Sequence, residues 1–370
     1  MGQSVKPLWL GAMLVAMSMA VMMQMAPLQA VLLNASFTEV GLIMGFARNL
    51  LYVIMSPLTA VVLSRINWNI PLPLSAVLMS ASSLIMWAAN DLLVVLAAQL
   101  IMGVSMFYFF PCGESIISNS FTGFSRFRAF SIFLSAVSGG FLIGSFLAGV
   151  IAYFASLRVL FAAAAFIALA GALLLSKTRI VNNVTETWNK TINFRTIAEP
   201  LFFSMPYFIM LASAYAVLPG FLVLSGLTEL DVGILFFSLM LARVAVSYAL
   251  SKMKLAMVYV LLPTLSMCLG LSLIASSFNT TNLAAFLATF MLVGAAVSVS
   301  YVRTLYFIST KAKEQDVFII GLFETLIGLA FLAGPPAAGF LTDVYGLPAL
   351  LQAFAAASVA AGLVNLKIRS

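Results

Sequence analysis

The chain has 370 residues, of which 63% are hydrophobic and 8% are charged, and its mean hydropathy is +1.14. Soluble domains have about 45–50% apolar and roughly 25% charged residues, so this composition excludes a water-soluble globule and indicates an integral membrane protein. The absence of histidine excludes the catalytic and zinc sites that depend on it. Cys112 and Cys268 lie in apolar stretches and predict neither a disulfide framework nor a metal site.

Apolar runs of about 20 residues, the length that crosses the hydrocarbon core as a helix, recur along the whole chain. Their aliphatic composition without two-residue alternation favours helices over a β-barrel. Glycine, proline, asparagine and charged clusters divide them into twelve predicted transmembrane helices, at 8–31, 39–63, 71–89, 92–113, 129–152, 156–175, 200–224, 230–250, 255–276, 282–304, 317–340 and 347–366.

The first run invites comparison with a signal peptide, because Lys6 precedes it and Leu28-Gln29-Ala30 resembles a cleavage site. Its apolar part is longer than the 7–15 residues typical of a signal peptide. We therefore expect it to be retained as the first transmembrane helix.

The distribution of lysine and arginine predicts the orientation. With the N-terminus in the cytoplasm, fourteen of these residues fall in cytoplasmic segments and only Arg158 falls in an outer loop. This bias obeys the positive-inside rule, so we expect both termini to be cytoplasmic. It also accounts for the net charge of +7 without a nucleic-acid partner.

The longest polar stretch, residues 176–198, divides the chain into two sets of six predicted helices. We expect an N-terminal bundle at 1–175, a cytoplasmic linker at 176–198 and a C-terminal bundle at 199–370. Three matches at a shift of about 190 positions indicate an internal repeat. They pair Pro27 with Pro219, the acid-containing helix starts at 36–41 and 227–233, and the glycine motifs at 144–149 and 334–339. Parallel repeats of this kind build transporters whose halves rock about a central site.

The chain resembles the major facilitator superfamily over essentially its whole length. In place of the family's loop motif after helix 2, Ser64-Arg65 retains only the arginine, and Gln99 replaces the arginine of the helix 4 motif. Helix 5 has Gly144-Ser145 where drug antiporters have Gly-Pro, whereas helix 11 keeps Gly334-Pro335. Arg243 and Ser251 match part of a helix 8 pattern common in organic-anion members. The resemblance implies the twelve-helix fold, and the departures from the family's motifs weaken the case for a proton-driven drug antiporter.

Two arginines are predicted to lie within the membrane. Arg48 is nine residues into helix 2, about 14 Å from its outer end, and Arg243 lies in the inner half of helix 8. A membrane-embedded arginine must face protein, water or an anion. Each could bind an anionic substrate or form a structural pair with a carboxylate, and the resemblance implies that both could reach the central cavity.

Glu324 is the only acid that this prediction places well inside a span. Burial favours the neutral form of a carboxyl group and a nearby cation favours the charged form, so Glu324 is a candidate for proton coupling. A permanent salt bridge with Arg243 or Arg48 is the structural alternative.

Other polar residues and prolines complete the candidate site. Proline within a helix permits bending, and we expect Pro27, Pro219 and Arg303 to act in gating. Each polar candidate for substrate binding could instead serve packing between helices; these candidates are Gln24, Asn49, Gln99, Tyr215 and Tyr301.

The sequence therefore predicts an all-α membrane protein that moves a small organic solute, preferably an anion, by secondary-active transport across the plasma or inner membrane. Efflux of amphipathic compounds is one alternative, and a non-transporting receptor or assembly factor is another. We expect a monomer in the lipid bilayer that is not an enzyme and binds no nucleic acid. We also expect no cofactor or metal. No phosphate-binding loop for ATP occurs, so the energy is expected to come from a gradient or from the solute itself.

Overall fold

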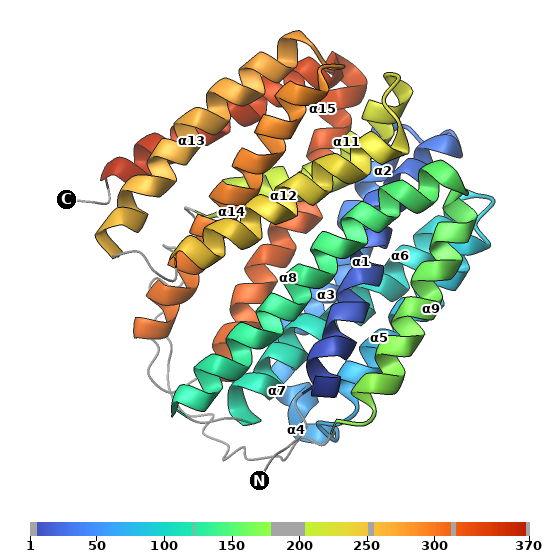
Figure 1. Ribbon diagram of the computed structural model, residues 1–370, viewed down its shortest axis with the longest axis vertical. Coiled ribbons are helices and arrows are strands. Elements are labelled where there is room, and N and C mark those ends of the chain that lie inside the picture. The colour runs from blue at the N-terminus through green and yellow to red at the C-terminus, as the bar shows by residue number, and fades with distance from the viewer. Residues whose placement is uncertain (1–5, 121–122, 179–203, 251–254, 312–315, 368–370) are drawn as a thin grey trace.

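The computed structural model describes residues 6–120, 123–178, 204–250, 255–311 and 316–367, which form helices and no strand (Figure 1). The N-terminal group comprises α1 (Lys6–Leu32), α2 (Phe37–Gly41), α3 (Arg48–Met55), α4 (Thr59–Arg65), α5 (Pro71–Trp87), α6 (Leu92–Phe107), α7 (Gly113–Ser120), α8 (Gly123–Phe154) and α9 (Leu157–Leu175). The C-terminal group comprises α11 (Met205–Leu224), α12 (Glu229–Leu250), α13 (Leu255–Phe278), α14 (Leu283–Lys311) and α15 (Asp316–Lys367).

Ten helical segments of the described residues are long and apolar enough to cross a membrane, and α5 is a shorter apolar helix of 17 residues. The segment Gly321–Leu366 contains two of the predicted helices, because Gly346 has a φ of 79° and breaks α15. With α5 included and α15 counted as two, the described segments match the twelve predicted helices. The predicted linker lies, from residue 179 onward, outside the described residues.

Two of the predicted helices contain irregular turns. The second is built from α2, the π-helical segment η1 (Leu42–Ala47), α3, the 3₁₀ segment η2 (Ser56–Leu58) and α4. The fourth is built from α6, the π-helical segment η3 (Tyr108–Cys112) and α7. The predicted end of this helix at residue 113 is wrong, because Pro111 is accommodated within the π turn and the helix continues to Ser120. π turns often occur at functional sites.

Glycine residues allow the two groups to approach closely where α8 meets α12 and where α2 meets α15. A Cβ atom at Gly149 would lie only 2.7 Å from the Cα of Gly233, and one at Gly41 would lie 2.3 Å from the carbonyl oxygen of Pro335. A larger side chain at these positions would separate the backbones. These contacts lie near the end of the bundle that carries the turns at 33–36, 225–228 and 346, which we call the upper end.

The upper end also confirms the two predicted helix starts. Ser36 and Glu39 form a reciprocal capping box at α2, and Thr228 and Asp231 form the equivalent hydrogen bonds at α12. Capping of this kind satisfies backbone amides that the first helical turn leaves unpaired. The shared arrangement supports the internal repeat.

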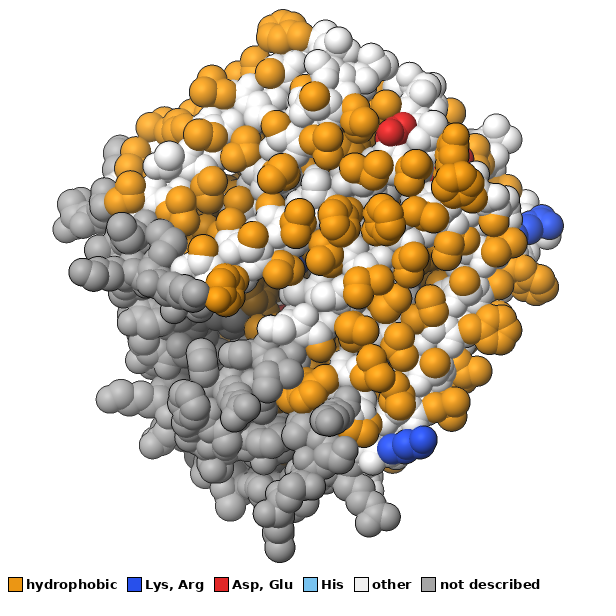
Figure 2. All heavy atoms as spheres, viewed as in Figure 1, with side chains coloured by type: hydrophobic (Ala, Val, Ile, Leu, Met, Phe, Trp, Pro, Cys, Tyr) orange, Lys and Arg blue, Asp and Glu red, His pale blue; other side chains and the backbone are white. Residues whose placement is uncertain are grey.

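The lateral surface is suited to lipid. Hydrophobic side chains cover much of the described face in Figure 2, and few charged groups are visible among them. On α9, Phe166 is 69% exposed and Leu173 is 62% exposed. A large exposed apolar surface of this kind would be unfavourable in water. By contrast, α1 and α11, which contain Pro27 and Pro219, are largely buried and pack against each other at the centre of the bundle.

Candidate functional site: a central cavity between the helix groups

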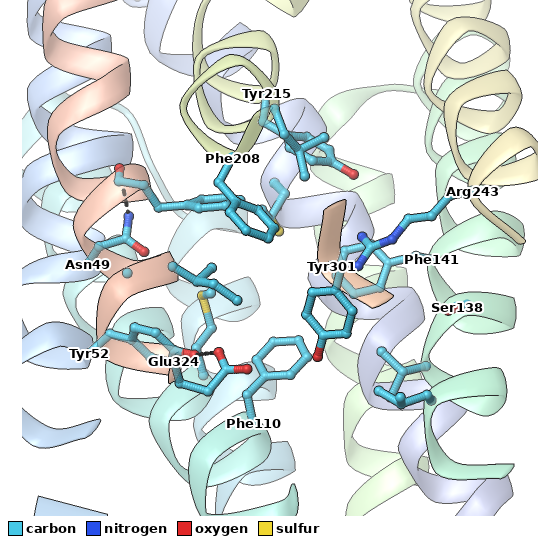
Figure 3. A pocket seen from close by; sticks show the side chains of 18 of the residues that line it. Asn49, Tyr52, Phe110, Ser138, Phe141, Phe208, Tyr215, Arg243, Tyr301 and Glu324 are labelled. Carbon is cyan, nitrogen blue, oxygen red and sulfur yellow. Dashed lines mark hydrogen bonds between the residues drawn. The ribbon is translucent and has the colours of Figure 1, made fainter. Parts of the chain in front are cut away.

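A cavity lies between the two helix groups, with about 880 Å³ of empty space that includes open solvent (Figure 3). Most of its wall is apolar and consists of Met23, Met106, Phe110, Leu134, Val137, Phe141, Phe208, Leu211, Met240, Ile327 and Phe331. Its polar lining residues are Asn49, Tyr52, Glu114, Ser138, Tyr215, Arg243, Tyr301 and Glu324.

Arg243 is the cation that lines this cavity. Its guanidinium carbon lies 5.8 Å from the centre of the Tyr301 ring, within range of a cation–π interaction. Figure 3 shows the side chain extending from α12 towards Tyr301 and Phe141. No described carboxylate forms an ion pair with it, so its donors are available to an anionic ligand.

Glu324 lies on another side of the cavity and is 4% exposed. The hydroxyl of Tyr52 donates a hydrogen bond to its Oε2 atom. The predicted alternative of a permanent salt bridge with Arg243 or Arg48 is not found among the described residues. The hydrogen bond from Tyr52 can be kept whether Glu324 is charged or neutral, because either form retains an acceptor oxygen.

Glu114 corrects the prediction that Glu324 is the only acid well inside a span. It lies one residue beyond the predicted end of the fourth helix, on α7, and is only 2% exposed. It lines the same cavity as Glu324 and lies within electrostatic range of it. The cavity lining among the described residues therefore includes two glutamates, Glu114 and Glu324, instead of the one expected.

Arg48 is fully buried at the start of α3. None of its three guanidinium nitrogens has a hydrogen-bond partner in the described part of the chain. Gly103 of α6 packs directly on its backbone, since a Cβ atom there would lie 2.0 Å from the Arg48 carbonyl oxygen. Arg48 is not among the residues that line the cavity; Asn49, its neighbour in sequence, is.

Tyr215 is the tyrosine that both arginines influence electrostatically. It lines the cavity, is 1% exposed, and its hydroxyl has no hydrogen-bond partner among the described residues. Both Arg48 and Arg243 lie within electrostatic range of this side chain. A stacked contact with Phe236, at 4.7 Å between ring centres, helps to hold its ring.

The other predicted binding residues divide between the cavity and the surrounding packing. Tyr301 lines the cavity. The Asn49 amide donates to the carbonyl of Gly45 at 2.8 Å, within the η1 segment, while its Oδ1 has no partner in the described chain. Gln24 donates to Ser145 of α8, and Gln99 is buried with no hydrogen-bond partner for either amide atom among the described residues. Neither glutamine lines the cavity.

The three residues predicted to act in gating lie away from the cavity lining. Pro27 and Pro219 occupy interior positions of the central helices α1 and α11. Arg303 donates a hydrogen bond to Asn365 near the end of α15. A role in gating stays a prediction for all three.

Three important residues were missing from the sequence-based site: Tyr52, Glu114 and Asp343. Tyr52 follows Arg48 by one helical turn and could have been found from that spacing. Glu114 was missed because the proline and glycine before it were interpreted as a helix end. Asp343 accepts hydrogen bonds from the other helix group, and no local pattern predicts such a contact.

Comparisons with known proteins agree with this architecture. A sequence profile of the Major Facilitator Superfamily matches residues 8–313. Among curated proteins, none matches the sequence significantly.

Solved structures of low sequence identity share the fold. The nucleoside transporter NupG superposes with a TM-score of 0.74 at 12% identity, covering 98% of this chain and 99% of its own. A bacterial homolog of the human lysosomal transporter Spinster, in an inward-facing and unoccupied conformation, gives a TM-score of 0.71 at 14% identity, with 98% and 94% coverage. The human organic anion transporter MFSD10 (TETRAN) gives 0.69 at 14% identity, with 98% and 99% coverage. The family profile and this shared fold show that the chain belongs to the Major Facilitator Superfamily of membrane transporters.

Proposed function

We propose that this protein is a secondary-active transporter of a small organic anion. The observation that carries the proposal is the buried guanidinium of Arg48, which has no partner in the described chain. An arginine at the membrane centre costs at least about 2.5–3.5 kcal/mol, and buried charges are normally paired. An acidic group of the substrate would supply the missing partner.

Arg243 and Tyr215 would receive this acidic group first, since both line the cavity. A guanidinium grips a carboxylate through two parallel hydrogen bonds, and the unpaired Tyr215 hydroxyl could add a third donor. Arg48 lies within electrostatic range of Tyr215 and would attract the anion further into the N-terminal group. The substrate would thereby contact residues of both helix groups.

Movement of the groups at 1–175 and 199–370 about the linker at 176–198 would then expose the cavity to alternate sides of the membrane. The lysine and arginine bias supports an orientation in which both termini are cytoplasmic and the upper end faces outside. In this orientation the close helix contacts at the upper end would close the outer side. We propose residence in the plasma or inner membrane.

Proton symport through Glu324 would supply the energy. This carboxyl group is buried, lines the substrate cavity and is hydrogen bonded to Tyr52 without an ion pair in the described chain. Its protonation would remove a negative charge from a cavity that also binds the anion. Substrate and proton would therefore favour each other's binding.

A thermal-shift screen of the purified protein against organic anions, cations and neutral solutes tests this function. A ligand at 100 times its Kd stabilises the folded state by about 2.7 kcal/mol, so a carboxylate that is bound should raise the melting temperature. Replacing Arg243 by Gln should abolish that shift. Equal stabilisation of both proteins by the same acids would contradict the proposal.

Transport of amphipathic or hydrophobic compounds is the second candidate, and the predominance of Phe, Met and Leu in the cavity wall supports it. Such compounds would gain most of their affinity from apolar burial. Under this alternative, neutral aromatic compounds should bind wild-type and Arg243→Gln proteins equally well.

A further inference from the structure

The cavity presents opposite charges that form no ion pair with each other among the described residues. Arg243 extends from α12, Glu324 extends from α15, and Glu114 lies on α7. Figure 3 shows the ring of Tyr301 between Arg243 and Glu324. None of these carboxylates forms an ion pair with Arg243 in the described chain. A ligand that bridged this space would therefore meet hydrogen-bond donors on one side and acceptors on the other.

Glu114 is the least satisfied of the acceptors. It is 2% exposed and lines the cavity, and no described residue donates a hydrogen bond to it or forms an ion pair with it. A second carboxylate, Glu324, lies within electrostatic range of it. Two neighbouring buried carboxylates cannot both keep a negative charge without compensation, so this side of the cavity favours a cation or a proton.

The opposite side has an excess of donors. Arg243 has no ion-pair partner among the described residues, and the buried Tyr215 hydroxyl has no hydrogen-bond partner there. The wall between the two sides includes the rings of Phe110 and Tyr301. Aromatic faces tolerate an ammonium group through cation–π attraction, whereas a bare metal ion requires several oxygen ligands.

We propose that the substrate is a zwitterion, an organic acid that also carries a protonated amino group, and that Glu114 binds the ammonium. The carboxylate would lie against Arg243 and Tyr215, and the aromatic and aliphatic wall would cover the body of the molecule. Glu324 would remain free to carry the coupling proton. With this proton and the zwitterion bound, both carboxylates of the cavity are compensated.

The anionic half of this proposal rests on the proposed function, and the ammonium half is independent of it. Three compounds of one scaffold separate the two halves: phenylalanine is the zwitterion, N-acetylphenylalanine keeps only the carboxylate, and phenylalaninamide keeps only the ammonium. A second set, with a longer distance between the charges, consists of 4-(aminomethyl)benzoic acid and its N-acetyl and amide derivatives. Binding to the purified full-length protein is measured by thermal shift and titration calorimetry. In at least one set, the zwitterion should bind about ten- to a hundredfold more tightly than either singly charged derivative.

Glu114→Gln should reduce the affinity for that zwitterion to that of its N-acetyl derivative, and it should leave binding of the N-acetyl derivative unchanged. Glu229→Gln serves as the matched control, since Glu229 lies in the first turn of α12 and does not line the cavity. The comparison of ligands on the wild-type protein tests the proposal even if Glu114→Gln does not fold.

Equal binding of zwitterion and N-acetyl derivative in both sets, with Arg243→Gln abolishing both, would overturn the zwitterion and keep the anion transporter. Binding of the amides alone, insensitive to Arg243→Gln, would overturn the proposed function and keep Glu114 as a cation site.

Discussion

The carboxylate of Asp343 accepts hydrogen bonds from the backbone amide and the hydroxyl of Thr38, at 2.7 and 2.6 Å. It also accepts one from the amide of Phe37 at 3.0 Å. A residue of the C-terminal group thus caps the first turn of α2 in the N-terminal group, where the helix dipole favours a negative charge. This contact joins the two groups at the upper end, where an alternating-access transporter would have to open.

Asp343→Ala should therefore favour opening of the upper end. The loss of a helix cap costs about 1 kcal/mol, which corresponds to about a fivefold increase in the open population. The measurement is the rate at which an impermeant thiol reagent, applied outside, labels Ser138→Cys in the cavity of a protein without other cysteines. Asp91→Ala is the control, because Asp91 caps α6 through the amide of Val94 within one helix group. Equal labelling rates for the two variants would contradict this role of Asp343.

Gly149→Val should prevent the upper end from closing. The added side chain would collide with the backbone of Gly233 on the facing helix, so we expect a folded protein that is open at the upper end and transports no substrate. Gly139→Val is the matched control, since a Cβ atom at Gly139 meets nothing within 4 Å. Loss of transport in both variants, or in neither, would argue against a closure at this contact.

Arg48→Met should stabilise the ligand-free protein and abolish its response to an anion. The substitution removes a buried charge that has no partner in the described residues and keeps a long apolar side chain, so the gain should be about 2 kcal/mol. Melting curves with and without the acid found in the screen provide the measurement. A large loss of stability would show that Arg48 has a structural partner and would contradict the anion site.

Glu324→Gln should separate substrate exchange from proton-driven accumulation. The amide mimics the neutral carboxyl and can still accept the hydrogen bond from Tyr52, so the protein should fold and exchange substrate down its own gradient. Accumulation driven by an imposed pH gradient should disappear. Tyr52→Phe is the companion variant, since it keeps the carboxyl group and should retain pH-driven accumulation. Accumulation that persists in a folded Glu324→Gln protein would exclude Glu324 as the proton carrier.

The helices could be predicted from the sequence because membrane spans depend on local composition, and the caps at Ser36 and Thr228 depend on local spacing. The chemical surroundings of buried groups depend on how distant helices pack. Thus the sequence identifies Arg48 as a membrane-embedded charge, but only the packing of the helices shows that its side chain is fully buried and that Gly103 lies against its backbone. The charge of the cavity was misjudged for a local reason: Pro111 lies within a π turn and does not end its helix.

Exchange of a labelled organic acid by protein reconstituted into lipid vesicles tests the central claim most directly. The probe is the acid that gives the largest thermal shift, and wild-type, Arg48→Lys and Arg243→Lys proteins are compared at equal amounts and melting temperatures. Lysine keeps the charge but loses the planar fork that grips a carboxylate, so each variant should show an increase of about tenfold or more in the substrate concentration that half-saturates exchange. Identical half-saturation in all three proteins, or no exchange of any acid by the wild-type protein, would contradict a transporter that recognises its anion through these two arginines.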